Sequence, residues 1–219
     1  MLSFKADLIE EDLFRVILSI LFLTFFFIRG YYTRKGQISN KGFLQKRIRR
    51  GISQEGKLNF FLQDAAASIW GVILLLYVFY PPWALWSTFP LPAWIRWLGV
   101  GLGAFSNVLL VWVHRVLGEY WSYILELKMN HTLITHGPYR WVRHPMYSAS
   151  LGFMAATALI SANWVVMLVC LLTVTVILKR ITIEEEMMIA GFGEEYRTYM
   201  RHTGRLLPWF MCICRVGMR

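Results

Sequence analysis

The feature that most constrains this chain is a series of apolar stretches, each close to the length of a membrane-crossing helix, joined by short polar segments. A helix needs about 20 apolar residues to cross the roughly 30 Å hydrocarbon core of a bilayer, and about 17–25 are tolerated. The first three stretches cover residues 13–28, 59–80 and 93–113. Only 16% of the residues are charged, against about 25% in soluble domains. We therefore predict an all-α integral membrane protein.

Two further apolar stretches, residues 146–160 and 164–178, are separated only by Ser161, Ala162 and Asn163. Each is short for a membrane span, and the segment between them carries no charge. We therefore expect a tight helical hairpin that enters the membrane and returns. The chain would then have about five membrane-crossing helices, the last two of which form this hairpin.

The distribution of basic residues predicts the orientation of these helices. Residues 29–57 hold nine Lys or Arg and one acid, Glu55, whereas residues 81–92 hold no charge. The positive-inside rule therefore places the first loop, the third loop and the C-terminal tail in the cytosol. We attribute the net charge of +10 to contact with anionic lipids of the cytosolic leaflet, and expect membrane lipids, not nucleic acid, as partners.

Little polar sequence is left to form a site. It lies in residues 114–144 and 179–219, which flank the hairpin and should share the cytosolic face. We therefore predict an N-terminal three-span region with a basic cytosolic loop over residues 1–113. A C-terminal catalytic region, with a cytosolic segment at its end, would cover residues 114–219. Cysteines 212 and 214 have no second pair of metal ligands, so we expect free thiols and no metal site.

Cationic and aromatic side chains are dense just before the fourth apolar helix. Arg143, His144 and Tyr147 should lie at its start, with Pro145 in the first turn, where proline is tolerated. A helix N-terminus offers backbone N–H groups and a partial positive charge, which suit a carboxylate or phosphate. The alternative interpretation is an ordinary belt of cationic and aromatic residues at the membrane interface.

A second cluster, Arg180 with Glu184, Glu185 and Glu186, follows the last apolar stretch. Three adjacent carboxylates repel one another, and a cationic ligand such as S-adenosylmethionine would relieve that repulsion. The alternative is a simple pair between Arg180 and Glu184, four residues apart on a helix, or a solvated charged face. Because the two clusters end the two arms of one hairpin, we expect them to be neighbours.

Together these motifs resemble the isoprenylcysteine carboxyl methyltransferase family, integral membrane enzymes that use S-adenosylmethionine. The resemblance covers residues 117–208. It rests on Gly-Pro-Tyr-Arg at 137–140, Arg-His-Pro-Met-Tyr at 143–147, Arg180 with Glu184-Glu185, Phe-Gly-Glu-Glu-Tyr at 192–196 and Arg-Leu-Leu-Pro at 205–208.

The resemblance implies a site for each reactant. The cofactor-binding residues would be His131, Thr132, Leu133, Ile134, Tyr139, His144, Pro145, Met146, Tyr147 and Glu184. Arg180 would be the catalytic and substrate-binding residue, holding the carboxylate of a lipidated, isoprenylcysteine-like acceptor beside the methyl group. Since a carboxylate has a reference pKa near 4, it is already ionised at neutral pH, and the protein mainly has to position it.

Two other activities stay open at this point. One is a phospholipid or small-lipid N- or S-methyltransferase that uses the same cofactor site. The other is a membrane reductase that binds NADPH. A transporter or scaffold is disfavoured, because we expect no span to carry paired ionisable residues along a pathway.

Overall fold

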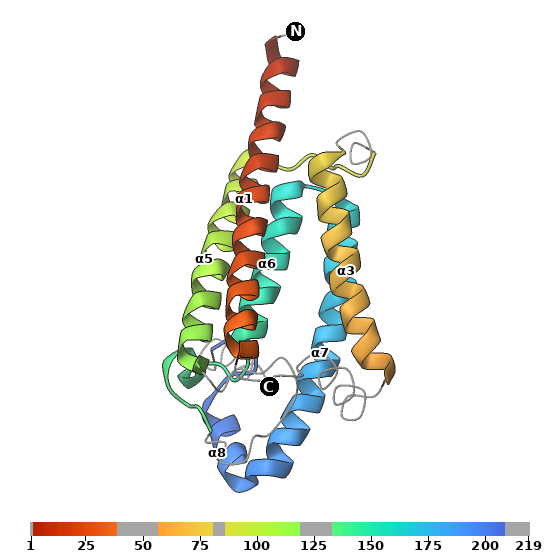
Figure 1. Ribbon diagram of the computed structural model, residues 1–219. Coiled ribbons are helices and arrows are strands. Elements are labelled where there is room, and N and C mark those ends of the chain that lie inside the picture. The colour runs from red at the N-terminus through yellow and green to blue at the C-terminus, as the bar shows by residue number, and fades with distance from the viewer. Residues whose placement is uncertain (1, 39–56, 81–85, 119–132, 209–219) are drawn as a thin grey trace, which may run out of the picture.

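The computed structural model describes residues 2–38, 57–80, 86–118 and 133–208, which are mostly helical (Figure 1). Its α-helices are α1 (Leu2–Ile38), α3 (Lys57–Phe79), α5 (Ala93–Leu117), α6 (Pro145–Ser161), α7 (Trp164–Phe192) and α8 (Glu194–His202), and a 3-10 helix, η2, covers Gly137–Arg140. The extended backbone within these ranges forms two isolated bridges, Thr88 with Asn163 and Val142 with Gly204. The predicted all-α character is confirmed.

Three of these helices are long and apolar enough to cross a membrane: Glu10–Lys35 within α1, Ala93–Leu117 and Trp164–Phe192. Their outward faces carry large apolar side chains, such as Phe27, which is 75% exposed, and Val108, which is 68% exposed. Soluble monomers rarely expose contiguous apolar surface on this scale. The surface therefore suits contact with lipid.

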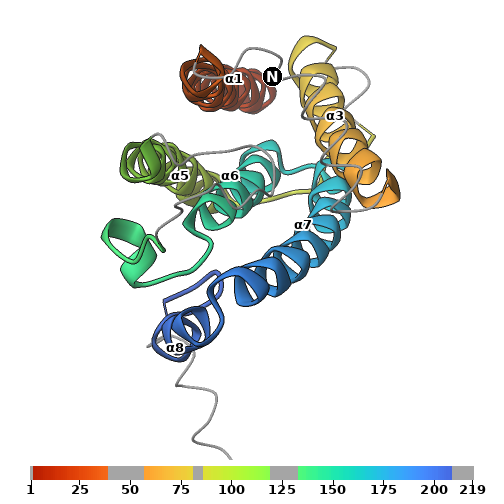
Figure 2. The ribbon, with the colours of Figure 1, turned by 60° about the horizontal axis from the view of Figure 1, so that its bottom comes forward.

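The helices run back and forth along one direction (Figure 1). α6 packs against α5, α7 and α1, while α3 packs against α7 and α1. The turn between α6 and α7 lies at the same end of the bundle as the start of α1, and α8 lies at the opposite end (Figures 1 and 2). α6 and α7 form a helical hairpin as predicted, and its passage through the membrane stays a prediction. α7 continues as one helix to Phe192, beyond the predicted apolar stretch.

The hairpin turn closes through two residues. Ala162 adopts the left-handed conformation, with φ 45°, and ends α6. The Asn163 side chain caps α7 by accepting hydrogen bonds from the backbone N–H groups of Val165 and Val166, at 3.0 and 3.1 Å. It also donates to Ser87 Oγ at 2.6 Å, which ties the segment before α5 to the turn.

Close helix packing explains two of the three glycines in α5. A Cβ atom on Gly99 would lie 2.8 Å from Leu159 Cβ of α6, and one on Gly103 would lie 3.0 Å from Leu21 Cδ1 of α1. Small residues at these positions therefore let the helices approach. Gly101 shows no such need, because a Cβ there would meet nothing within 4 Å.

An ion pair at the hairpin-turn end corrects one expectation from the sequence. Arg96 of α5 is only 5% exposed; it pairs with Glu11 of α1, and its Nε donates to Ile160 O at 2.9 Å. Its guanidinium carbon lies 4.0 Å from the Phe14 ring centroid. The bundle thus does contain paired ionisable residues, and this pair ties α1, α5 and α6 together.

Candidate active site

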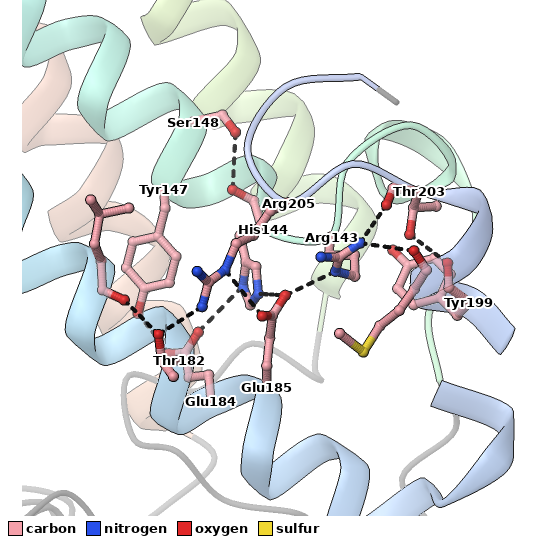
Figure 3. A network of polar contacts seen from close by, with 12 residues as sticks. Arg143, His144, Tyr147, Ser148, Thr182, Glu184, Glu185, Tyr199, Thr203 and Arg205 are labelled. Carbon is pink, nitrogen blue, oxygen red and sulfur yellow. Dashed lines mark hydrogen bonds and ion pairs between the residues drawn. The ribbon is translucent and has the colours of Figure 1, made fainter. Parts of the chain in front are cut away.

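The candidate site lies at the α8 end of the bundle, where η2, the start of α6 and the second half of α7 meet (Figure 3). Gly137 begins η2 with φ 62°, a conformation that favours glycine. Pro145 begins α6, where its missing N–H costs nothing. These two residues set the path of residues 137–147, which carry half of the predicted cofactor-binding residues.

Residues 203–208, which we call the strap, run beside this segment. Arg143 N donates to Gly204 O at 2.8 Å, and His144 N donates to Arg205 O at 3.1 Å. Ser148 Oγ, in the first turn of α6, donates to Leu206 O at 2.6 Å. Two backbone N–H groups next to the start of α6 are therefore occupied by the chain itself.

His144 lies between two carboxylates. Its Nδ1 is 3.5 Å from Glu184 Oε2, and its Nε2 is 3.4 Å from Glu185 Oε1. Burial by itself would lower the pKa of His144, but the Glu184 and Glu185 carboxylates outweigh it and raise that pKa above its ordinary value. The geometry therefore favours a charged imidazolium.

Glu184 joins three other predicted site residues in one contact group. Tyr147 donates its hydroxyl to Glu184 Oε1 at 2.6 Å, and Arg180 Nε lies 3.3 Å from the same oxygen. With His144 on the other oxygen, Glu184 has three donors. A carboxylate has about four lone-pair sites, so Glu184 retains acceptor capacity for a ligand hydroxyl or cation.

Besides His144, Glu185 contacts two arginines that are not among the predicted cofactor-binding or substrate-binding residues. Arg143 Nε is 2.9 Å from its Oε1, and Arg205 Nε of the strap is 3.0 Å from its Oε2. Arg205 also donates from Nη2 to Thr182 Oγ1 at 2.8 Å (Figure 3). Helical spacing was the sequence signal that Glu184 and Glu185 would have different partners. Each residue turns a helix by about 100°, so Glu185 projects from a different face of α7 than Glu184.

These contacts show that side chains of the protein itself neutralise the acidic cluster, in place of the cationic ligand expected from the sequence. Four cationic side chains, namely Arg143, His144, Arg180 and Arg205, surround the carboxylates of Glu184 and Glu185. Glu186 is exposed. The repulsion expected between adjacent carboxylates is thus already relieved within the protein. Among the described residues, four cationic side chains thus contact two carboxylates at this site.

Tyrosines join η2 to α8 beside this network. Tyr199 donates its hydroxyl to Tyr139 O at 2.6 Å. Burial raises the pKa of Tyr139, Tyr196 and Tyr199 well above the ordinary value, with neighbouring groups adding smaller effects, so all three stay neutral phenols at physiological pH. Arg143 also donates to Met200 O at 3.1 Å, which fixes the end of α8 to the start of α6.

The structure describes most of the predicted site. His144, Tyr147, Arg180 and Glu184 are in contact as stated, and Tyr139 lies in η2. Pro145 is buried and Met146 half-buried at the start of α6, while Leu133 and Ile134 are half-buried before η2. His131 and Thr132 lie outside the described residues, as do Cys212 and Cys214.

Known methyltransferases resemble this chain in sequence. The phospholipid methyltransferase family model matches residues 94–195. Protein-S-isoprenylcysteine O-methyltransferase of Rattus norvegicus is 28% identical over 157 residues, 70% of this chain and 53% of that protein. Methanethiol S-methyltransferase of Mycobacterium tuberculosis is 30% identical over 132 residues, 58% of this chain and 49% of that protein. The chain spans about half the length of the curated relatives it matches.

A solved structure shares the fold. It is that of the eukaryotic intramembrane Ras methyltransferase, an isoprenylcysteine carboxyl methyltransferase, with a TM-score of 0.51 and 18% identity. The match covers 91% of this chain and 93% of that one. The resemblance that the sequence motifs indicated is therefore confirmed by sequence relatives and by fold.

Proposed function

We propose that this chain is an integral-membrane methyltransferase that uses S-adenosylmethionine to methylate the carboxylate of a lipidated, isoprenylcysteine-like acceptor. The observation that carries the proposal is the contact group of Arg180, Glu184, His144 and Tyr147 at the open end of the α6–α7 hairpin. Its residues come from the motifs shared with membrane methyltransferases. The guanidinium of Arg180 suits an anionic acceptor.

The proposed cofactor residues have complementary roles. Glu184 has acceptor capacity for a hydroxyl or cationic group of the cofactor, and Tyr147 and His144 hold that carboxylate in place. Tyr139, Leu133, Ile134 and the start of α6 would line the same region. When bound, S-adenosylmethionine supplies an electrophilic methyl group on a sulfonium. The protein's task is to hold the acceptor in line with it.

Arg180 is the proposed acceptor-binding residue. It is 9% exposed, and it pairs with Glu184 through Nε. A guanidinium presents five N–H donors in a planar fork, a geometry that matches a carboxylate. Positioning of this kind is worth roughly 7–11 kcal/mol in well-oriented reactions. Arg180 would thereby set the attack geometry.

The protonation states favour an acceptor that arrives ionised. The raised pKa of His144 favours the charged imidazolium, which is a poor proton acceptor, and the buried tyrosines stay neutral. An amine or thiol acceptor would have to lose a proton to some group. A carboxylate requires no such base at neutral pH.

The membrane arrangement completes the proposal. We propose about five crossings, with the site on the cytosolic side, and the division into residues 1–113 and 114–219 given above. The apolar tail of the acceptor would approach from the lipid between helices whose outer faces are apolar. Its carboxylate would then meet the cofactor at the membrane surface.

A transfer assay tests the proposal directly. Purified protein in lipid nanodiscs is given radiolabelled S-adenosylmethionine with an S-prenylated N-acetylcysteine, and the methyl ester of the same molecule serves as the matched control. We expect label in the free acid and none in the blocked ester. Thermal shifts add a second readout, with stabilisation by S-adenosylhomocysteine and none by NADPH. Equal labelling of acid and ester would overturn the carboxylate assignment.

The similarity to methanethiol S-methyltransferase supports a second candidate, transfer to a thiol on the same cofactor site. A thiol has a reference pKa near 8.5. Below that value, the rate of its methylation should rise roughly tenfold for each unit by which the pH rises, because the thiolate fraction rises by that factor. The rate with a carboxylate acceptor should not rise in this range. The pH dependence of labelling therefore separates the two acceptors.

A further inference from the structure

The three adjacent glutamates of α7 occupy three different environments. Glu184 contacts Arg180, Tyr147 and His144, all residues of the proposed site. Glu185 is 8% exposed and is held by cations from outside α7. Glu186 is exposed. Because the same side chain occupies three consecutive positions, a substitution at one glutamate serves as the matched control for the same substitution at another.

We infer that Glu185 is a positioning residue that orients His144 against Glu184, and that Arg205 of the strap and Arg143 hold Glu185 in place for that purpose. The inference rests on the proposed function and extends it to residues that contact neither reactant. It assigns the strap a part in forming the site.

The geometry supports this role because Glu185 joins three separate parts of the chain. Arg143 and His144 precede α6, Glu185 lies on α7, and Arg205 follows α8. The strap is tied to residues 143–148 by backbone and serine hydrogen bonds. Glu185 therefore fixes both the imidazole and the strap to one turn of α7.

The electrostatics give the consequence of losing Glu185. Without the Glu185 carboxylate that both contact, the guanidinium groups of Arg143 and Arg205 would repel each other, as like charges at close range do. His144 would keep only Glu184 as a carboxylate partner. Among the described residues, the groups that contact this imidazole are Tyr147 on α6 and Glu184 and Glu185 on α7. The charged partners of these carboxylates are Arg143 before α6, Arg180 on α7 and Arg205 on the strap, and the buried Tyr139 and Tyr196 lie near them.

The first test compares Glu185→Gln with Glu186→Gln in the full chain. We expect Glu185→Gln to weaken S-adenosylhomocysteine binding about tenfold by calorimetry, the size of one charge-assisted contact. In protein labelled with ¹⁵N-histidine, the His144 signal, identified with His144→Gln, should titrate at lower pH in Glu185→Gln than in wild type. Glu186→Gln should match wild type in both readouts.

A purely structural role would give a different result. Glu185→Gln would then lower the melting temperature yet leave both the S-adenosylhomocysteine affinity and the His144 titration as in Glu186→Gln, and the inference would be overturned. Restoration of both readouts by Glu185→Asp, which keeps the carboxylate, would support the positioning role.

If Glu185→Gln does not fold, the variant Arg205→Gln provides a second test of the inference. Its side chain is 37% exposed, so Arg205→Gln should be tolerated, and Arg201→Gln on the exposed face of α8 is its control. We expect Arg205→Gln to shift the His144 titration and to weaken cofactor binding about threefold. No change in either readout would overturn the role of the strap.

Failure of this inference and failure of the proposed function are distinguishable. The His144 titration needs no ligand and no turnover, so it tests the positioning role even in a protein that transfers no methyl group. If wild type bound no S-adenosylhomocysteine but the titrations still differed as expected, the proposed function would fail while the role of Glu185 toward His144 would stand.

Discussion

The two ends of the helical bundle both contain buried charge, but they use it differently. At the hairpin-turn end, Arg96 pairs with Glu11 and donates to Ile160 O, so one cation meets one anion and a carbonyl. At the α8 end, four cations surround two carboxylates, and Arg205 remains 37% exposed. A balanced pair holds helices together. A group of arginines beside solvent can also bind an anionic ligand.

This contrast has an electrostatic basis. Buried charge is costly unless paired and hydrogen-bonded, and the Arg96 site meets that condition with groups of the protein alone. The α8 end meets it for both carboxylates through four cations among the described residues. We therefore expect substitutions at the first end to act on stability, and substitutions at the second to act on binding and turnover.

The largest effect on activity should follow Arg180→Ala. Loss of the acceptor-binding guanidinium should lower kcat/KM for methyl transfer about 10²-fold or more, because misplacement by about 1 Å already costs that much. S-adenosylhomocysteine binding, measured by calorimetry, should change little. Lys179→Ala, at the exposed neighbouring position, is the control. Normal turnover in Arg180→Ala would remove the contrast between the two ends.

Glu184→Gln should have the next largest effect and should act on the cofactor. Its carboxylate accepts from Tyr147 at 2.6 Å, and removal of a charged acceptor of this kind costs about 1.5–3 kcal/mol. We expect S-adenosylhomocysteine to bind at least tenfold more weakly. If calorimetry showed unchanged binding, the carboxylate would belong only to the internal ion network.

Arg96→Met should act on stability and spare the chemistry. Glu11 would lose its partner, but its side chain is 35% exposed, so the cost should fall below the 3–5 kcal/mol of a fully buried pair, at about 1–2 kcal/mol. Thermal unfolding in nanodiscs should report this loss. The kcat at a temperature where the variant is folded should equal that of wild type. A lower kcat there would mean that both ends serve the reaction.

The smallest effect should be a dependence of stability on pH that originates at the α8 end. The folded protein raises the pKa of His144, so this contribution is fully present below the ordinary value of about 6.5 and is lost as pH rises through the raised pKa. Melting temperatures measured upward from about pH 6.5 should therefore decline in wild type more than in His144→Gln. His202→Gln, at an exposed position, should behave as wild type. Parallel curves for all three proteins would contradict the charged state of His144.

Local features of the site were predictable from the sequence. The pair of Arg180 with Glu184 follows from helical spacing, and the meeting of His144 with Glu184 follows from a hairpin whose two arms end together. The pair of Arg143 with Glu185, 42 residues apart, follows in the same way, because both residues belong to the two clusters expected to be neighbours. The contact of Arg205 with Glu185 was not predictable, because the strap pairs with residues 141–144 through backbone hydrogen bonds that leave no side-chain pattern.

The helices and the hairpin were determined by the sequence alone, because the length of an apolar stretch and an uncharged turn decide where a chain can cross a bilayer. The sequence also indicated the methyltransferase resemblance, through motifs of fixed order. Only the tertiary structure decided which charges meet. Glu11 reaches Arg96 across 85 residues, and Arg205 reaches Glu185 from beyond α8. Such pairs depend on how helices pack, and packing brings together residues whose separation in sequence carries no periodic signal.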